Sequence, residues 1–270
     1  MSGREDFLNA RATPHESLLE EAERILSGAE SKGITLRLLG GVAVGMRCPS
    51  ASKAPLTRRY VDIDVIGHRK ETAKIKQLFG ELGYRPRERF NALHGSRFIF
   101  NDIKHQRRVD VFLDVFQMCH KFDFKDRMGL EPRTLPVSDL LATKLQIVEI
   151  NEKDIKDILA LLLDHDVSAA EVPDGINAAY IAKLCAEDWG MYRTFTVNLA
   201  KIGEYAGGSG LDDEQRRRVS ARAESLRSSI EAMPKTMGWK MRARVGDRKR
   251  WYELPEADQE VVDSGIPSVR

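Results

Sequence analysis

The chain has 270 residues, of which 42% are hydrophobic and 31% are charged, and its formal net charge is +2. These values predict a globular protein of one large or two small domains and exclude a disordered chain or a wholly basic nucleic-acid coat protein. No apolar run is long enough to span a membrane, and the charged residues 1–6 have no apolar segment behind them, so we expect no membrane contact and no secretory signal. Three well-separated cysteines form no disulfide or metal-binding pattern, which favours a reducing cytoplasm: Cys48, Cys119 and Cys185.

The first 133 residues mix helical and strand patterns. Apolar residues at helical spacing predict helices over 16–30 and 71–82, and a short helix after Gly40-Gly41. Strands are predicted over 34–39, 60–66, 96–101 and 107–116, with a polar loop at 48–59 and a short link at 102–106 that joins the last two strands as a hairpin. This part is therefore expected to be an α+β domain with a small mixed sheet and flanking helices.

The alternation of helical and strand patterns ends at a segment that contains Pro132 and Pro136. Helices are expected over 138–149, 152–163, 176–206 and 212–232, and no strand is evident from 137 to 232. We therefore predict a helical domain over 134–233 after the α+β domain of residues 1–133. Residues 234–270 are expected to form a basic, largely irregular tail.

Two aspartates alternate with apolar residues in the predicted strand Val61-Asp62-Ile63-Asp64-Val65. Because side chains alternate along a strand, Asp62 and Asp64 share one face and the apolar residues share the other. Two neighbouring carboxylates repel each other unless a cation lies between them, and Mg²⁺ prefers such oxygen ligands. A solvent-exposed edge strand with two surface aspartates is the alternative.

A third acid lies in the apolar strand Arg107-Arg108-Val109-Asp110-Val111. Asp110 alternates with apolar neighbours and is expected to project from a sheet face, while Asp114 is a rival further along. Gly40-Gly41 follows another strand and precedes a helix, where a backbone without side chains can approach a phosphate closely. Of the six histidines, only His68 is expected near these residues.

This order of strand, Gly-Gly, helix, Asp-x-Asp strand, helix, hairpin and third aspartate resembles the nucleotidyltransferase superfamily typified by DNA polymerase beta. The resemblance implies that Asp62, Asp64 and Asp110 hold two divalent cations, Mg²⁺ with Mn²⁺ as the alternative. It further implies that Gly40 and Gly41 seat the triphosphate of an NTP, and that Asp110 accepts the proton of the attacking hydroxyl.

A closer resemblance, over residues 35–165, is to the AbiEii-type group, whose members are often toxins in toxin–antitoxin pairs. Gly40-Gly-Val-Ala43, Asp62-Ile-Asp64, Thr143-Lys144 and Lys153-Asp-Ile-Lys-Asp157 fit its motif order. The resemblance implies an antitoxin partner. It also implies nucleotide-binding roles for Lys144, Lys153 and Asp157, although Lys153 and Asp157 are spaced to pair with each other instead. Arg47 could contact phosphates after the glycine helix, or be solvated.

The tail gathers cations and aromatic residues: Lys235, Trp239, Lys240, Arg242, Arg244, Arg248, Lys249, Arg250, Trp251 and Tyr252. Such a mixture suits contact with an RNA or tRNA acceptor, whereas docking on the protein's own acidic surface is the alternative. The sequence thus predicts a nucleotidyltransferase that moves an NMP from an NTP to a hydroxyl of an RNA end, a protein or a small molecule, releasing pyrophosphate. The rival hypothesis is a non-catalytic nucleotide- or RNA-binding module on the same fold.

Overall fold

The computed structural model describes residues 13–254. Its main sheet contains seven strands, of which five follow the order β1-β2-β5-β4-β3 and two form a hairpin beyond β5. The strands are β1 (Leu36–Leu39), β2 (Asp62–Gly67), β3 (Arg85–Pro86), β4 (Arg97–Asp102), β5 (Arg107–Leu113), β6 (Val115–Gln117) and β7 (Lys121–Asp123). The sheet is mixed, since β2 and β5 are parallel whereas β1, β3 and β4 pair antiparallel with their neighbours.

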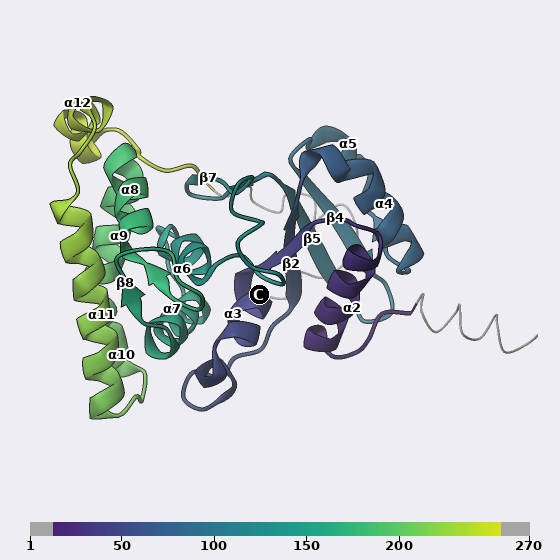
Figure 1. The fold of residues 1–270 in the computed structure, drawn as a ribbon, viewed down its shortest axis with the longest axis horizontal. Coiled ribbons are helices and arrows are strands. Elements are labelled where there is room, and N and C mark those ends of the chain that lie inside the picture. The colour runs from purple at the N-terminus through teal and green to yellow at the C-terminus, as the bar shows by residue number, and fades with distance from the viewer. Residues whose placement is uncertain (1–12, 255–270) are drawn as a thin grey trace, which may run out of the picture.

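The two faces of this sheet pack against different helices. On one face, Phe100 of β4 stacks on Phe79 of α4 (Thr72–Glu81) with ring centroids 4.4 Å apart. In Figure 1 this face is covered by α2 (Leu18–Ser31) and α4, while α3 (Gly40–Arg47) and the later helices lie on the opposite side. Residues of the second face, which include Asp110, therefore look toward the helical part of the chain.

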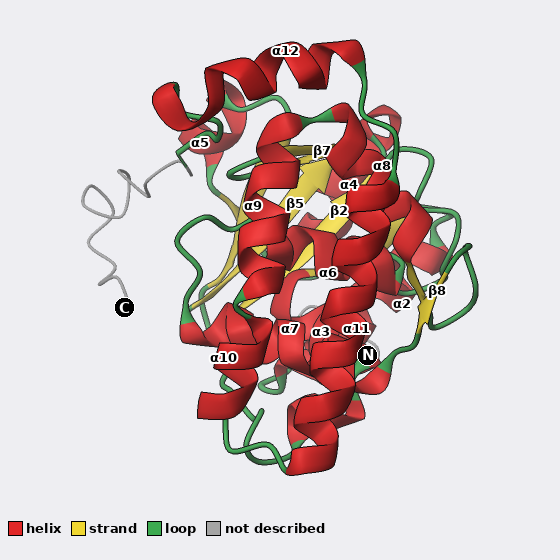
Figure 2. Cartoon of the chain, turned by 90° about the vertical axis from the view of Figure 1, so that its left-hand side faces the viewer, coloured by secondary structure: helices red, strands yellow, loops and turns green. Residues whose placement is uncertain are grey.

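The helical part follows the sheet and ends with a long helix, α11. Its helices are α6 (Val137–Leu145), α7 (Glu152–Asp164), α8 (Ala178–Glu187), α9 (Trp189–Ala200), α10 (Ile202–Gly208) and α11 (Asp213–Ala232). Figure 2 shows these helices as a layer in front of β2 and β5. Together with the sheet they give the α+β architecture that the sequence predicted.

The expected boundary at 133/134 marks a change of secondary structure, but one apolar core runs through both sides of it. A single cluster of buried residues extends from Ala22 in α2 to Ile230 in α11. The backbone also crosses the boundary, because Leu38 of β1 donates to Arg133 and Leu135 donates back to Leu38. The described helical part therefore packs directly on the sheet.

Several elements differ from the sequence prediction. The helical part includes two short parallel strands, β8 (Val167–Ser168) and β9 (Ile176–Asn177), where no strand was expected. A short helix, α5 (Glu88–Leu93), precedes β4, and α6 ends at Leu145 rather than near 149. Two-residue strands and a six-residue helix leave too few residues for a periodic pattern, so sequence reasoning misses them.

The described tail, 234–254, is not largely irregular as expected. It contains the helix α12 (Met237–Val245), which Thr236 caps by accepting a hydrogen bond from the Trp239 amide, and the short 3₁₀ segment Gly246–Arg248. No described helix combines the length and apolar character needed to cross a membrane. The described residues do not include 1–12 or 255–270. The second of these ranges is the end of the predicted tail.

Candidate metal and nucleotide site

The three predicted acids converge on one face of the sheet. Asp62 and Asp64 lie on β2, and the parallel register places Asp64 directly beside Asp110 of β5. Because residues paired across neighbouring strands point to the same side, all three carboxylates face the helical part. One oxygen from each lies within 4.8 Å of the other two. This spacing lets a single cation contact all three.

The electrostatics of this cluster favour a bound cation. Burial, followed by the charge of Asp110, raises the pKa of Asp62 above its usual range. Burial, followed by the charges of Asp62 and Asp110, raises the pKa of Asp64 well above it. Arg108 offsets part of this repulsion. An all-oxygen donor set under mutual repulsion is the chemistry that Mg²⁺ or Mn²⁺ stabilises, so these residues fit the implied metal.

Asp110 is the most buried acid of the three, with 1% of its surface exposed, and two arginines hold it. Arg97 of β4 places Nε 2.9 Å and Nη2 2.7 Å from Asp110 Oδ1. Arg108 of β5 places Nε 2.7 Å from Oδ2, but this oxygen accepts no hydrogen bond from any described group, so that contact is an ion pair only. Both carboxylate oxygens therefore face positive charge.

The glycine pair lies directly against the acids, because β1 ends beside Asp64 in the register with β2. Gly40 has a φ of +69°, which side-chain-bearing residues rarely adopt. A Cβ atom added there would overlap Asp64 Oδ2 and lie 3.0 Å from its Cγ. Leu39, the residue that precedes α3, offers no side-chain cap. The first amides of α3 are therefore free of a capping side chain beside the carboxylates, as an anion site requires.

Arg58, from the polar loop before β2, fills the space in front of Gly41. A Cβ atom on Gly41 would overlap the Arg58 guanidinium and lie 2.9 Å from its Cζ. Arg58 also stacks on Tyr60 at 4.6 Å from the ring centroid. Its Nε and Nη2 each donate to Asp157 at 2.7 Å. Asp157 thereby fixes a cation against the glycine turn.

Lys144 of α6 brings a second cation from the helical part. Its Nζ lies 2.9 Å from Asp154 Oδ1 and 2.8 Å from Asp157 Oδ2. Burial by itself lowers the pKa of Lys144, but the two carboxylates more than offset this effect and raise it, so the ammonium stays charged. The charge of Lys144 also acts on Asp62 and Asp64 by lowering their pKa values.

The structure does not bring Lys153 or Arg47 to this cluster. Lys153 is exposed on α7, and the alternative pairing with Asp157 is absent among the described ion pairs because Asp157 pairs with Arg58 and Lys144. Arg47 lies at the opposite end of α3 from the glycines, about 10 Å along the axis. It is neither solvated nor aimed at the acids, since its guanidinium binds three other side chains: Glu131, Thr134 and Asp174.

The rival acid and the expected histidine lie elsewhere. Asp114 has a φ of +59° after β5, and its Oδ1 lies 3.3 Å from Nδ1 of His68. His68 follows the far end of β2, about 20 Å along the strand from Asp62. The pair therefore lies beyond the opposite ends of β2 and β5 and takes no part in the acid cluster.

Sequence reasoning missed three arginines of the site: Arg58, Arg97 and Arg108. Arg108 could have been found, because it precedes Asp110 by two residues and so shares its face of the strand. Arg97 depends on the antiparallel pairing of β4 with β5, and Arg58 on the path of a loop. Neither position leaves a periodic pattern in the sequence.

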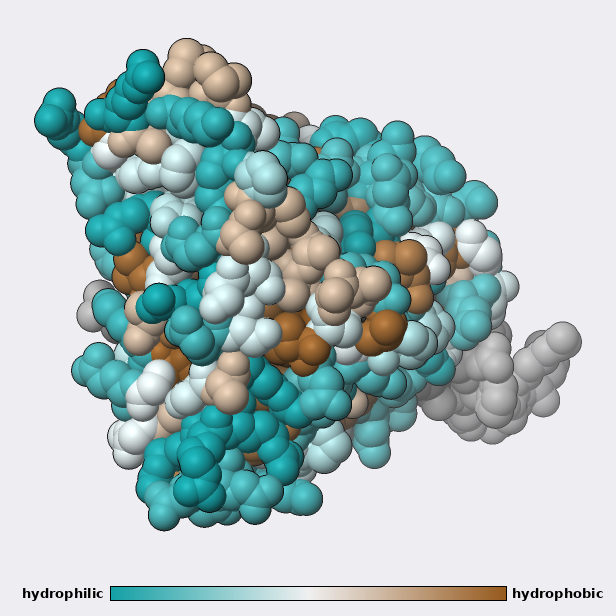
Figure 3. All heavy atoms as spheres, turned by 60° about the vertical axis from the view of Figure 1, so that its left-hand side comes forward, coloured by the Kyte–Doolittle hydropathy of each residue, from teal (hydrophilic) through white to brown (hydrophobic). Residues whose placement is uncertain are grey.

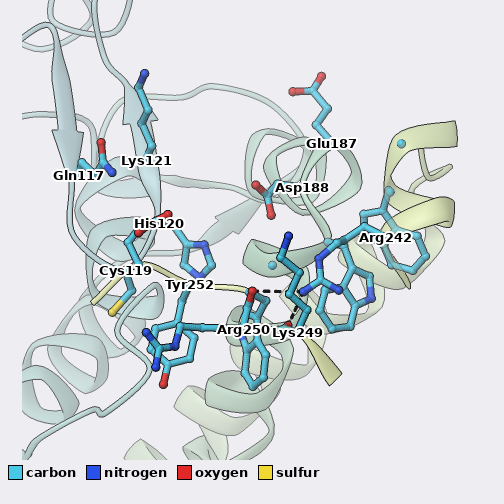
Figure 4. A pocket seen from close by; sticks show the side chains of 16 residues that line it. Gln117, Cys119, His120, Lys121, Glu187, Asp188, Arg242, Lys249, Arg250 and Tyr252 are labelled. Atoms are coloured by element: carbon cyan, nitrogen blue, oxygen red, sulfur yellow. Dashed lines mark hydrogen bonds between the residues drawn. The ribbon is translucent and has the colours of Figure 1, made fainter. Parts of the chain in front are cut away.

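The described tail docks through aromatic side chains rather than on an acidic surface. Trp251 Nε1 donates to Thr194 at 3.0 Å, its ring meets Trp189 edge-on, and Arg242 lies 4.5 Å from the Trp189 centroid. A cavity of about 550 Å³ lies beneath this segment, with Cys119 and His120 on one side and Arg242 on the other (Figure 4). Cys119 and His120 are buried there as packed side chains.

The docked tail leaves five cations exposed and without ion pairs inside the described range: Lys240, Arg244, Arg248, Lys249 and Arg250. In Figure 3 the end of the molecule that carries α12 is largely hydrophilic, with an apolar cluster at its tip. Met237 and Met241 of α12 are 71% and 61% exposed. The tail thus presents both charge and apolar surface outward.

Comparison with protein-family models and with curated proteins finds no match. Among solved structures, the chain is similar to the antibiotic-resistance factor ANT(2'')-Ia, whose solution structure has been described in terms of substrate-regulated conformation dynamics. The identity is 14% and the TM-score 0.36, over 79% of this chain and 93% of that one. A similarity this low says nothing about function, which has to be inferred from the geometry of the site.

Proposed function

We propose that this protein is a metal-dependent nucleotidyltransferase, which moves an NMP from an NTP to a hydroxyl acceptor and releases pyrophosphate. The observation that carries the proposal is the convergence of Asp62, Asp64 and Asp110 to within 4.8 Å beside the Gly40–Gly41 turn. Repelling carboxylates at metal-binding distance next to a free helix start match the two needs of this chemistry, cation binding and phosphate binding.

Bound Mg²⁺ would supply charge neutralisation at the attacking and leaving oxygens, and Asp62, Asp64 and Asp110 would hold it. The amides that follow Gly40 and Gly41 would donate to phosphate oxygens. The acceptor oxygen attacks the α-phosphorus, the bond from the α-phosphorus to the bridging oxygen breaks, and pyrophosphate leaves with that oxygen. A carboxylate oxygen of Asp110 would take the proton of the attacking hydroxyl.

Lys144 and Asp157 would act together in this scheme. Asp157 holds both Lys144 and Arg58, and Arg58 lies in front of Gly41, where the phosphates would be seated. Arg58 is thereby added to the expected phosphate-binding residues, whereas the positions of Lys153 and Arg47 provide no support for such a role.

The acceptor is proposed to be an RNA end, with a protein hydroxyl or a small molecule as the alternatives. The exposed cations of the tail supply the phosphate-binding surface that such an acceptor needs. An antitoxin partner stays a prediction from the family resemblance. The described cysteines are buried and unbridged, which agrees with the proposed cytoplasmic location.

The test is a transfer assay with each α-labelled NTP, Mg²⁺ or Mn²⁺, and total RNA or cell lysate. Wild-type protein is expected to transfer label, Asp110→Asn to lose at least about 100-fold of the rate, and Asp62→Asn likewise. Asp114→Asn is the matched control, because this acid lies after the same strand but outside the cluster. Nucleotide or RNA binding without transfer, and unaffected by Asp62→Asn, would instead identify the non-catalytic module.

A further inference from the structure

The proposed function leaves one feature of the acid cluster unexplained. A carboxylate that serves as metal ligand and general base works best without competing cations, yet both oxygens of Asp110 lie beside a guanidinium group: Oδ1 accepts from Arg97, and Oδ2 forms an ion pair with Arg108 without a hydrogen bond. A cation that enters the cluster must compete with Arg97 and Arg108 for this carboxylate, because like charges in so small a volume repel. The arginines therefore oppose metal binding as long as they stay in place.

The positions of the two arginines allow them to move away from Asp110. Their side chains are 25% and 28% exposed, whereas Asp110 is 1% exposed, so part of each arginine side chain reaches solvent while the carboxylate does not. In the parallel register Arg108 lies opposite Asp62, so Arg108 is a neighbour of two of the three acids. The Arg97 guanidinium lies 5.4 Å from the ring centroid of Phe112 and 5.7 Å from that of Phe90, so it contacts two aromatic rings.

A triphosphate offers these arginines a better partner than a shared carboxylate. Phosphate oxygens accept the same charge-assisted, often bidentate hydrogen bonds from guanidinium groups, and an NTP seated at Gly40–Gly41 would bring several of them to the same face of the sheet. The exchange would leave no guanidinium without a partner and would free the Asp110 carboxylate, which already lies in the cluster, of two competing positive charges.

This inference rests on the proposed function. We infer that Arg97 and Arg108 form an arginine clamp, which holds Asp110 before substrate binds. When the metal–NTP complex binds, the two arginines exchange Asp110 for the triphosphate. The clamp keeps a lone divalent cation weakly bound and couples release of Asp110 to arrival of the nucleotide. Arg97 and Arg108 are thus nucleotide-binding residues and, through Asp110, positioning residues.

The clamp predicts opposite changes in two affinities. With Arg97→Gln or Arg108→Gln, binding of Mn²⁺ alone to the full-length protein should become about tenfold tighter, because a competing charge is lost. Binding of the Mg²⁺ complex of ATP, GTP, CTP or UTP should become about tenfold weaker, because a phosphate contact is lost. Mn²⁺ electron paramagnetic resonance and calorimetry measure the two quantities. Each single variant leaves the other arginine beside the buried carboxylate, and both affinities are measured below the unfolding temperature of the variant, which thermal unfolding gives.

Two control variants make the experiment specific. Arg85→Gln removes an exposed arginine of β3 on the same sheet and should change neither affinity. In an Asp110→Asn background, Arg97→Gln should no longer tighten Mn²⁺ binding, since its gain depends on release of that carboxylate.

The possible outcomes separate the clamp from the proposed function. Affinities that fall together, or do not change, overturn the clamp, and tighter Mn²⁺ with unaltered NTP binding overturns the transfer of the arginines to phosphate. In each of these cases, label transfer by the wild-type protein would leave the proposed function standing. A wild-type protein that binds neither Mn²⁺ nor any NTP would overturn both.

Discussion

Gly40→Ala tests whether the glycine turn exists to let Asp64 approach the backbone. The substitution has two separable costs. A residue with a Cβ at a φ of +69° costs about 1–2 kcal/mol. Its Cβ would also overlap the Asp64 carboxylate, and such crowding costs about 1–3 kcal/mol. The expected loss is about 2–5 kcal/mol of the free energy of unfolding, measured by urea denaturation.

Gly33→Ala is the matched control for the first cost. Gly33 follows α2 with a φ of +64°, but a Cβ there meets nothing within 4 Å. It should therefore lose only the conformational contribution of about 1–2 kcal/mol. The excess loss in Gly40→Ala measures the close approach of Asp64.

A double-mutant cycle locates this excess at one contact. In an Asp64→Ala background the Gly40 Cβ would meet no carboxylate, and the nearest remaining atom, the Cβ of residue 64, lies 3.2 Å away. We therefore expect a coupling of about 1–3 kcal/mol between the two substitutions. If Gly40→Ala costs no more than Gly33→Ala, or if the coupling is absent, the reasoning that Asp64 requires this glycine is refuted.

Three further predictions follow from the charges and the tail. Burial and neighbouring carboxylates raise the pKa of Asp64 in the folded state, so its stabilising contribution is complete below its unfolded pKa and is lost as pH rises. Asp64→Asn should therefore raise the unfolding temperature in metal-free buffer at neutral pH, and the gain should vanish below about pH 4; a pH-independent gain would contradict this origin. Asp157→Asn leaves Arg58 and Lys144 without their shared carboxylate and should lower the free energy of unfolding, measured by urea denaturation, by about 3–5 kcal/mol. Glu152→Gln, at an exposed position of the same helix, should change it by no more than about 0.5 kcal/mol, and equal losses in the two variants would show that the Asp157 network adds no stability. Trp251→Ala removes the hydrogen bond to Thr194 and should speed tryptic cleavage near Arg248 about tenfold, with the exposed Met237→Ala as control; an unchanged rate would show that Trp251 does not hold the tail.

Much of the site could be predicted from the sequence because strands and turns have short local periods. Alternation placed Asp62 and Asp64 on one face, and the structure adds Asp110 to that face. Gly40 was predicted as a point where the backbone approaches a phosphate, and the structure shows the Asp64 carboxylate close to it. These residues depend only on local geometry, which the chain encodes within a few positions.

The cations around the acids depend on contacts between distant segments. Asp157 and Arg58 are 99 residues apart, and Lys144 joins them from another helix. Spacing along α7 left a pair between Asp157 and Lys153 open, but the half-buried Arg58 and the buried Lys144 take this carboxylate, since a buried charge needs compensation more than an exposed one does. Arg47 likewise binds acids brought to it by the fold.

The sequence by itself determined the α+β class, the faces of the acidic strands and the glycine turn, because each follows from periods of two to four residues. Only the tertiary structure decided that β2 and β5 lie parallel with Asp64 beside Asp110, that two arginines close on Asp110, and that the tail docks through Trp251. Strand order, register and long-range ion pairs are set by how apolar faces and buried charges are satisfied across the whole chain, and no local pattern records that outcome.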